Sequence, residues 1–461
     1  MIIKGVIALE EKILELIKSK KYSLLKTTLS EMNPADIAQI LNIIEPNELT
    51  IIFRILPKEL ASEVFVEMDS DMQQILIEGF SDAELRAVMD ELFMDDTVDI
   101  IEEMPASVAK RILRQTDNAT RQLINQLLAY PDDSAGSIMT TEYVDLKRSM
   151  TVEEAFERIR KIGVDTEIIY TCYVMDSGRR LQGIVSVKDL LLNDKSCVIE
   201  DIMDENIIYA TTHDDKEDVA ALFEKYDMIA LPVVDKEGRL VGIITVDDAI
   251  DVMQEEASED IEKMAAILPS EKTYLKTGVF ETFKARIPWL LFLMISATFT
   301  GAIISGFESK LTVFPALIAF IPMLMGTGGN SGSQSSVTII RSLSLGDIEF
   351  SDILRVVWKE LRVGFFCGAV LCVVNLIKLY LVDYLMMNSF DIKHEISEML
   401  TVCFTLFFVV IVAKLIGSVL PIVAKKIGFD PAVMASPLVT TILDAISLFI
   451  YFAIAGVLLG I

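Results

Sequence analysis

The chain has 461 residues, which is enough for several domains, and a formal net charge of −27 at pH 7. Residues 287–461 hold only 11 of its 68 acidic and 10 of its 41 basic residues, so nearly all of the negative charge lies in the first 286 residues. Such a surface attracts cations and excludes nucleic acid as a partner, because phosphates need Lys or Arg contacts. The two histidines and five cysteines, with no CxxC pair, exclude imidazole or thiolate metal sites and a disulfide framework, so metal chemistry must use oxygen ligands.

Residues 1–130 predict a stack of short helices. The opening stretch MIIKGVIALEEKILELIKSKKYS interleaves charges with apolar residues at helical spacing, so we do not expect a signal peptide. Apolar residues recur at helical spacing in DIAQILNII, ELASEVFVEM, AELRAVMDELF and SVAKRILRQ, between breaks such as NPAD and LPKE. We expect these helices to stack into a small superhelical domain.

An internal repeat follows, at an offset of 59 residues. LQGIVSVKDLL at 181–191 matches LVGIITVDDAI at 240–250, and TVEEAFERIRK and DKEDVAALFEK repeat upstream in the same order. This duplicated order resembles a tandem pair of CBS domains, an α/β module that senses ligands without chemistry of its own. We place the first domain at 131–200 and the second at 201–255. Residues 248–286 continue one helical pattern, so we predict an unbroken connecting helix, with 256–286 as its own segment.

The last part of the chain, residues 287–461, predicts a five-helix transmembrane domain. Apolar segments at about 287–307, 311–340, 357–382, 399–424 and 433–460 reach the ~20 residues that a bilayer requires. Arg341, Arg355, Lys359, Arg362, Lys425 and Lys426 fall on one side, and Lys310 and Lys393 on the other. The positive-inside rule then predicts a multi-pass protein of the cell membrane with a cytoplasmic N-terminus and an external C-terminus. The expected fold class is a multidomain membrane protein with a helical superhelix, an α/β CBS pair, a long connecting helix and five membrane helices.

Asp444, in the last predicted span, is the acidic side chain that we expect near the middle of the membrane. A carboxylate at that depth costs a few kcal/mol, so it marks an ion pathway. The same helical face carries further oxygens, from Ser436, Thr440, Ser447 and Tyr451. Two copies of Asp444 related by a twofold axis would hold a hydrated divalent ion better than one, which favours a homodimer with a shared pore. The alternative is an ion pair with Lys414.

Acidic residues of the soluble part cluster at two places. Asp95 and Asp99 lie one helical turn apart, and Asp248, Asp251, Glu256, Glu259 and Asp260 line the start of the predicted connecting helix. A solvated helix face would also explain such a run. Two carboxylates about 4 Å apart repel by roughly 4 kcal/mol at an effective dielectric constant near 20. Switching a two-state gate takes about 5.5 kcal/mol, so one or two bridging divalent ions would suffice to set its state.

Three motifs carry a resemblance to a family. PMLMGTGGNSGSQSSVTIIRSL at 322–343, AYPDDSAGSIMTTEYV at 129–144 and DPAVMASPLVTTILDAIS at 430–447 resemble, in this order, the motifs of MgtE-type magnesium channels or transporters. The resemblance implies a homodimer in the bilayer, with its pore between the second and fifth spans. The pore or ion-binding residues are then expected to be Asp444, Ser436, Thr440, Gly328, Gly329 and Asn330.

The resemblance also implies that cytosolic Mg²⁺ closes the pore by bridging the soluble domains and the connecting helix. The positions that match regulatory ligands are Glu63, Asp95, Asp99, Asp227, Asp248, Asp251, Glu256, Glu259, Asp260 and Asp430. Some relatives bind ATP at the CBS pair, and Thr245 and Asp248 stand where a ribose would be held. Lys414 has no place in the family pattern.

Other functions stay open from sequence alone. These are transport of Mn²⁺ or Co²⁺, a CBS-regulated anion channel, and a membrane-anchored sensor; an enzyme is not expected, because no nucleophile and base form a constellation. The composition of MGTGGNSGSQSS, residues 325–336, is that of a flexible linker, yet it lies inside the uncharged segment 311–340. Within a membrane, such small polar residues persist where helices pack closely or line a cavity. We therefore expect the stretch to form one wall of a pore.

Overall fold

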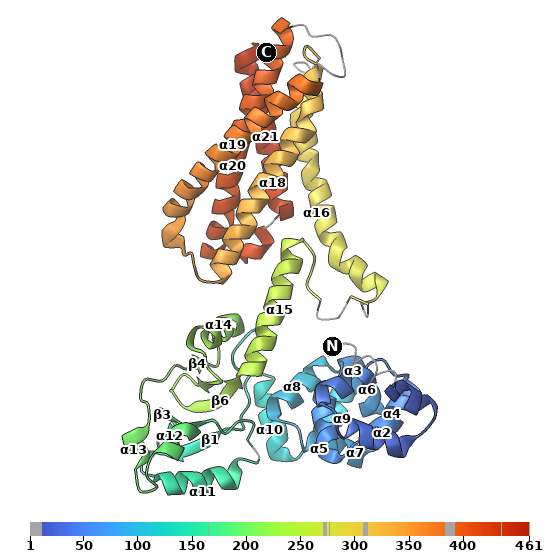
Figure 1. Ribbon diagram of the computed structural model, residues 1–461, viewed down its shortest axis with the longest axis vertical. Coiled ribbons are helices and arrows are strands. Elements are labelled where there is room, and N and C mark those ends of the chain that lie inside the picture. The colour runs from blue at the N-terminus through green and yellow to red at the C-terminus, as the bar shows by residue number, and fades with distance from the viewer. Residues whose placement is uncertain are drawn as a thin grey trace. The chain divides into compact units, whose positions relative to one another are not determined.

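The computed structural model describes residues 12–164, 166–270, 274–275, 277–307, 312–382, 392–434 and 436–460 (Figure 1). The chain divides into two compact units, Met1–Met253 and Gln254–Ile461, and each unit is treated separately below. The first unit contains the helical stack and the α/β repeats. The second contains the membrane helices.

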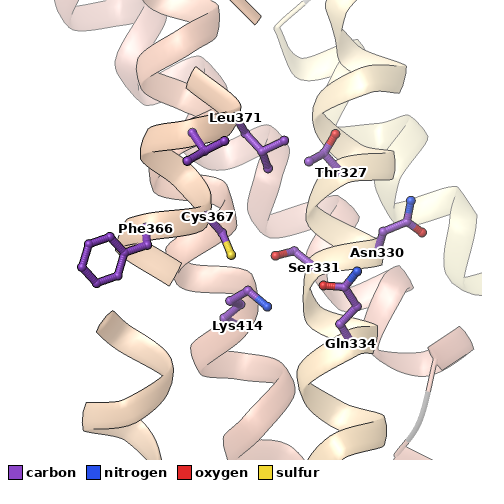
Figure 2. A pocket seen from close by; sticks show the side chains of 9 residues that line it. Thr327, Asn330, Ser331, Gln334, Phe366, Cys367, Leu371 and Lys414 are labelled. Atoms are coloured by element: carbon purple, nitrogen blue, oxygen red, sulfur yellow. The ribbon is translucent and has the colours of Figure 1, made fainter. Parts of the chain in front are cut away.

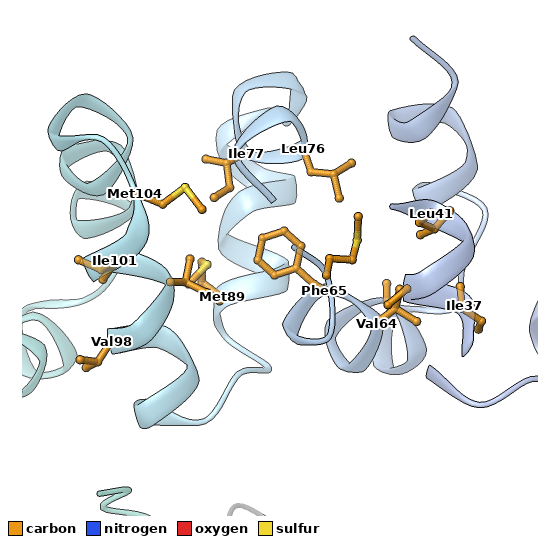
Figure 3. Packing of buried hydrophobic residues seen from close by; sticks show 14 of the residues in the cluster. Ile37, Leu41, Val64, Phe65, Leu76, Ile77, Met89, Val98, Ile101 and Met104 are labelled. Atoms are coloured by element: carbon orange, nitrogen blue, oxygen red, sulfur yellow. The ribbon is translucent and has the colours of Figure 1, made fainter. Parts of the chain in front are cut away.

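The helical stack consists of short helices in which alternate members pack against each other, as α3 does with α5, and α5 with α7. A superhelical stack is the arrangement that the sequence predicts. The helices are α2 (Tyr22–Leu29), α3 (Pro34–Leu41), α4 (Pro46–Phe53), α5 (Lys58–Val66), α6 (Ser70–Gly79), α7 (Asp82–Met89), α8 (Met94–Glu103), α9 (Ala106–Gln115) and α10 (Asn118–Leu127). Their apolar faces meet in one core, in which Phe65 and Leu76 are fully buried (Figure 3).

Local signals set the starts of these helices. Asn33 caps α3 through a hydrogen bond from the Ala35 backbone N–H, and Pro34 occupies the first helical position, where the missing N–H costs nothing. Ser81 and Glu84 form a reciprocal capping box at α7. Such caps satisfy backbone donors that a short helix cannot pair internally.

The repeats form two small sheets with the same topology. In the first, β1 (Val144–Lys147) pairs in parallel with β2 (Thr171–Met175), which pairs antiparallel with β3 (Leu181–Ser186). In the second, β4 (Ala210–Thr211), β5 (Ala230–Val234) and β6 (Leu240–Thr245) repeat that order. The helices of the repeats are α11 (Val152–Ile162), α12 (Val187–Leu192), α13 (Ile199–Ile202) and α14 (Lys216–Tyr226).

The two repeats pack against each other through buried residues of β2, β5 and β6, which include Tyr173 and Ile243. Backbone hydrogen bonds also join them, among them one from the Leu181 N–H to the Gly238 carbonyl and one from the Leu240 N–H to the Arg179 carbonyl. The offset of 59 residues in the sequence therefore corresponds to a paired α/β module.

The predicted unbroken helix over 248–286 is wrong. Helix α15 runs from Val246 only to Met264, Ala266 adopts a left-handed backbone conformation, and the next helix begins at Val279. The physical reason lies in Pro269, because a proline disfavours helical geometry in the residue before it and cannot continue the hydrogen-bond ladder. The apolar residues keep their helical spacing across Pro269, so periodicity alone does not show where the helix ends.

The described residues of the second unit form five long helices: α16 (Val279–Gly306), α18 (Ala316–Ser344), α19 (Ile353–Val382), α20 (Ile392–Lys426) and α21 (Ser436–Leu459). Short 3₁₀ turns, η1 (Phe350–Asp352) and η3 (Pro431–Met434), precede α19 and α21. Among the described residues, four segments are long and apolar enough to cross a membrane: Val279–Gly306, Phe350–Leu381, Ile396–Lys426 and Pro431–Leu459. Helix α18 has 29 residues, also enough to span, but its Gly/Ser stretch makes it less apolar.

Candidate functional site

Three carboxylates from distant parts of the first unit form an acid cluster, consisting of Asp95, Glu167 and Asp248. Each offers an oxygen within 4.8 Å of the others. Asp95 lies in the first turn of α8, Asp248 in the first turn of α15, and Glu167 in the segment between α11 and β2. Only 6% of the surface of Asp95 is exposed. The folded chain therefore concentrates negative charge where water is scarce.

Burial and mutual repulsion raise the pKa values of these groups. The pKa of Asp95 is raised well above its usual range by burial, then by the charges of Glu167 and Asp248. Burial and Asp248 raise the pKa of Glu167 to about 8, and burial raises that of Asp248 to about 6. Asp96 and Asp99, on the same helix as Asp95, have pKa values raised to about 7, first by burial and then by Asp248.

The acid cluster is suited to a hard cation. Oε2 of Glu167 is buried, and within the described part of the chain it has no hydrogen-bond partner. Carboxylate oxygens are the ligands that Mg²⁺ prefers, and Mg²⁺ keeps several waters while using one or two carboxylates. A divalent ion here would favour the ionised forms that burial otherwise opposes.

Other predicted ligands of the first unit lie outside this cluster. Glu63 is exposed on α5, and it is Glu67, the residue after that helix, whose charge contributes to the raised pKa of Asp96. Asp227 is exposed in a left-handed conformation at the end of α14. Asp251 lies one turn beyond Asp248, and its pKa is raised by burial and by Asp247.

A second group of acids surrounds the end of α15, within the second unit. Lys263 Nζ lies 2.8 Å from Glu259 Oε1 and 2.8 Å from Asp430 Oδ2. Asp260 accepts a hydrogen bond of 3.3 Å from the hydroxyl of Ser344 in α18. The structure therefore brings together three of the predicted ligands, Glu259, Asp260 and Asp430, but it places a lysine between two of them. Glu256 lies half-buried one turn earlier on α15.

Glycines of α18 allow that helix to pack very closely on its neighbours. A Cβ at Gly328 would lie 2.7 Å from Ser447 Oγ, and one at Gly329 would lie 3.0 Å from Thr440 Cγ2, both on α21. A Cβ at Gly417 of α20 would lie 2.2 Å from the carbonyl oxygen of Gly332. The Gly/Ser stretch thus forms tight helix contacts, which are characteristic of membrane bundles.

The polar face expected on α21 is divided by this packing. Tyr451 is fully buried and donates a hydrogen bond of 3.0 Å to the Leu317 carbonyl, and Ser447 packs under Gly328. Thr440 donates to the Pro437 carbonyl, while Asp444 is half-buried. Ser447 and Tyr451 therefore serve helix packing instead of facing an ion. Ser436 begins α21, but its side chain lies outside the described part of the structure.

A cavity of about 460 Å³ lies between α18, α19 and α20. Its polar wall is formed by Thr327, Asn330, Ser331, Gln334 and Lys414, and its apolar wall by Phe366, Cys367, Val370 and Leu371. Figure 2 shows Ser331, Cys367 and Lys414 turned toward the same space. Asn330, a predicted pore residue, therefore lines a cavity, whereas Gly328 and Gly329 are buried in helix contacts.

Lys414 is 5% exposed, and its contacts replace the ion pair that we weighed from sequence. Its Nζ lies 3.5 Å from Ser335 Oγ, and that hydroxyl donates a hydrogen bond of 2.7 Å to Glu360 Oε2. No ion pair joins Lys414 to Asp444 in the described residues, which include both side chains. The buried ammonium is therefore balanced by Glu360 on α19 through a bridging serine.

Comparison with known proteins gives matches over nearly the whole chain. The family description "Divalent cation transporter" matches residues 321–454, "MgtE intracellular N domain" matches 32–133, and "CBS domain" matches 135–195 and 199–255. The magnesium transporter MgtE of Thermus thermophilus is 35% identical over 439 residues, which cover 94% of this chain and 95% of the relative. The chain belongs to the MgtE family of magnesium transporters. The MgtE protein of Bacillus subtilis is 31% identical over 96% of each chain.

Solved structures agree with this membership. The cytosolic domain of the Mg²⁺ channel MgtE in complex with ATP is 34% identical and aligns with a TM-score of 0.50, covering 53% of this chain and 99% of that one. The soluble part of a magnesium transporter is 28% identical, with a TM-score of 0.51 over 55% of this chain. MgtE membership confirms the predicted family and magnesium transport, and it rules against an anion channel, a mere sensor or an enzyme.

The residues predicted to hold a nucleotide have a duplicate in this MgtE chain. Thr245 donates a hydrogen bond of 2.5 Å from Oγ1 to Asp248 Oδ2, and at the offset of 59 residues Ser186 Oγ donates one of 2.5 Å to Asp189 Oδ2. Asp248 belongs to the acid cluster, whose negative charge repels a triphosphate, whereas Asp189 is exposed. The two repeats therefore offer the same side-chain pair in different electrostatic surroundings.

Sequence reasoning missed three residues of these sites: Glu167, Lys263 and Glu360. Glu167 lies in the segment DTEIIY, which carries no acidic run at helical spacing, and only the fold places Glu167 beside α8 and α15. Lys263 follows Glu259 at the i,i+4 spacing that favours an ion pair, and this signal was available. Glu360 lies in the first turns of α19, inside the predicted span 357–382, and its sequence neighbours give no sign that it approaches Ser335 of α18.

Proposed function

We propose that two copies of this magnesium transporter form a Mg²⁺ channel in the cell membrane that Mg²⁺ itself closes from the cytosolic side. The observation that carries the proposal is the acid cluster of Asp95, Glu167 and Asp248, with its buried unpaired oxygen at Glu167. Such a cluster is costly without a cation, so occupancy by Mg²⁺ changes the stability of the contact between α8, α15 and the first repeat.

The ion pathway is proposed to pass Asp444 on α21. A half-buried carboxylate on a membrane helix is expensive and is retained for function. Because one carboxylate holds a hydrated Mg²⁺ weakly, a second copy of Asp444 across a twofold axis supports a homodimer. Thr440, Ser436 and Asn330 are retained as neighbouring oxygens, while Gly328 and Gly329 act by allowing α18 to approach α21.

The proposal also includes the orientation of the membrane helices and the binding of ATP. The basic residues at the ends of α18, α19 and α20, such as Arg341, Arg355 and Lys426, support a cytosolic position of those ends by the positive-inside rule. ATP is proposed to bind the CBS pair, because a related cytosolic domain was solved with ATP. Measuring ATP affinity in the single variants Asp248→Asn and Asp189→Asn tells which repeat binds the ribose. The variant that loses affinity carries the substitution in the binding repeat.

Flux through proteoliposomes tests the pathway. Replacing Asp444 by Asn keeps the size of the side chain and removes its charge, so we expect Mg²⁺ uptake to fall at least about tenfold. The matched control is Asp352→Asn, a carboxylate at the end of η1 that forms an ion pair with Arg355 and accepts a hydrogen bond from the Glu349 backbone N–H. Uptake at the parental rate in Asp444→Asn would remove Asp444 from the pathway. Competing Mn²⁺, Co²⁺ and Ca²⁺ in the same assay measure selectivity.

A further inference from the structure

The end of helix α15 is held against the membrane helices by a lysine. The ammonium of Lys263 bridges Glu259 on its own helix and Asp430, which lies just before η3. Asp430 is itself fixed, because its other oxygen accepts a hydrogen bond of 2.7 Å from the Ala432 backbone N–H. The side chains of Lys263 and Asp430 are 25% and 34% exposed, so solvent weakens this bridge less than it does a fully exposed pair.

Apolar and backbone contacts accompany the ionic bridge. Met264 packs with Ile340 of α18 and Ala432 of η3. Beyond the helix, the Leu268 backbone N–H donates a hydrogen bond of 3.0 Å to the Ala285 carbonyl of α16. The last turn of α15 therefore contacts α18 and the residues around η3, and the segment after it contacts α16. We call this set of contacts the α15 latch.

The acids of the latch repel one another when no cation lies between them. Asp260, next to Glu259, has a pKa raised by burial and then by the charge of Asp430. One positive charge between Glu259 and Asp430 reduces this repulsion, and Lys263 supplies it from inside the chain. A divalent ion in the same place would do so only while its concentration is high.

We propose that Lys263 is a tethered cation that substitutes for Mg²⁺ at Glu259 and Asp430 and keeps the α15 latch docked when Mg²⁺ is scarce. Glu259, Asp260 and Asp430 then lose part of the regulatory role expected of them. The Mg²⁺ response is left to the acid cluster around Asp95. What docking does to flux rests on the proposed function, whereas the docking itself does not.

Hydrogen exchange on the full chain tests the latch. The peptide covering residues 259–268 is followed with and without Mg²⁺ in the parent, in Lys263→Gln and in the control Lys284→Gln, an exposed lysine of α16. Without Mg²⁺, we expect exchange in Lys263→Gln to be about tenfold faster than in the parent, because local opening becomes easier. Adding Mg²⁺ restores its protection, since the ion replaces the lost ammonium. The parent and Lys284→Gln stay protected in both conditions.

Two results would overturn the inference. One is equal protection of Lys263→Gln and the parent without Mg²⁺, and the other is a parent that loses protection without Mg²⁺ as fully as Lys263→Gln does. Lys263→Arg keeps the charge and is expected to behave like the parent. If Lys263→Gln does not fold, Asp430→Asn, which removes the partner, is expected to show the same local increase in exchange.

The outcome is separable from that of the proposed function. Mg²⁺-dependent closure is read from flux, and latch docking is read from exchange. A parent that stays protected but whose flux does not respond to cytosolic Mg²⁺ would contradict the proposed gating and leave Lys263 as a structural tether. A parent with Mg²⁺-dependent flux, beside a Lys263→Gln variant with unchanged exchange, would contradict the latch alone.

Discussion

At the scale of single residues, the acid cluster predicts a stability that depends on both pH and Mg²⁺. The pKa values of Asp96 and Asp99 near 7 and of Glu167 near 8 lie above the value of about 4 expected in an unfolded chain. Between these limits the folded chain holds protons that the unfolded chain releases, so its free energy of unfolding falls as pH rises from about 4 to about 8. Below pH 4 both states hold the protons and the dependence ends.

This dependence of the unfolding free energy on pH predicts how Mg²⁺ changes stability. In the proposed site Mg²⁺ binds the ionised carboxylates. The rise in the melting temperature of the full chain on adding Mg²⁺ is therefore expected to be larger at pH 8 than at pH 5.5. An ion at 100 times its Kd adds about 2.7 kcal/mol. Asp95→Asn removes one of the repelling charges and should lower this response, while Asp90→Asn, an exposed acid after α7, should leave it unchanged. A Mg²⁺ response that is equal at both pH values would contradict the assignment.

Lys414 gives a second prediction at this scale. Lys414→Met removes the ammonium that Ser335 connects to Glu360. Because the two charges meet through that hydroxyl and not in a direct ion pair, we expect a loss of stability below the ~3–5 kcal/mol of a broken buried ion pair. The double variant Lys414→Met with Glu360→Gln removes both charges, so we expect it to melt at a higher temperature than Lys414→Met alone. Lys378→Met, an exposed lysine of α19, is the control. Additive losses in the double variant would show that the two charges do not compensate each other.

Residue-level prediction from sequence succeeded where the chain supplies local spacing. Asp95 and Asp99 were identified because one helical turn separates them, and both lie in or beside the acid cluster. Glu167 was out of reach, because its nearness to Asp95 and Asp248 exists only in the folded unit. Tyr451 is a case in which local spacing misled. Helical spacing places it on the same face as Asp444, but its hydroxyl donates a hydrogen bond to the Leu317 carbonyl.

At the scale of helices, the contact between α18 and α20 depends on the absence of side chains. The Cβ of Gly417→Ala would lie 2.2 Å from the Gly332 carbonyl oxygen, so the two backbones must separate. Such overpacking typically costs about 1–3 kcal/mol. Gly326→Ala is the matched control, because nothing lies within 4 Å of its Cβ and alanine is the better helix former.

Thermal unfolding in detergent measures the cost of separating α18 from α20. The expected result is a lower melting temperature for Gly417→Ala and an unchanged or higher one for Gly326→Ala. Equal melting of the two variants would show that α18 and α20 are not in close contact. The stretch MGTGGNSGSQSS is thus a packing surface with one polar side, since Asn330, Ser331 and Gln334 line the cavity.

The predicted helix ends differ from the observed ones for two reasons. Four of the described membrane helices, α16, α18, α19 and α20, extend past the predicted apolar segments. Charged ends continue the helix there, as Lys425 and Lys426 do in α20. The prediction of an unbroken connecting helix over 248–286 failed, because α15 ends at Met264, before Pro269. Helical period shows which face is apolar but not where the chain leaves the helix.

At the scale of the whole molecule, the order of its parts was readable from sequence. The 59-residue repeat predicts paired α/β folds, and three motifs in a fixed order predict the family, which the relatives confirm. The coupling between the parts was not readable, because it depends on which carboxylates meet and which cation lies between them. We propose that the acid cluster uses Mg²⁺ as that cation and that the α15 latch uses Lys263.

The most direct test of this account is Mg²⁺ flux through proteoliposomes as a function of Mg²⁺ on the side that carries the acid cluster. We predict that flux through the parent falls at least about tenfold as that concentration rises into the millimolar range, as expected for a ligand-driven population shift. Asp95→Asn is expected to stay open at concentrations that close the parent and the Asp90→Asn control. Closure of Asp95→Asn at the parental concentration, or a parental flux indifferent to Mg²⁺ on that side, would contradict the account.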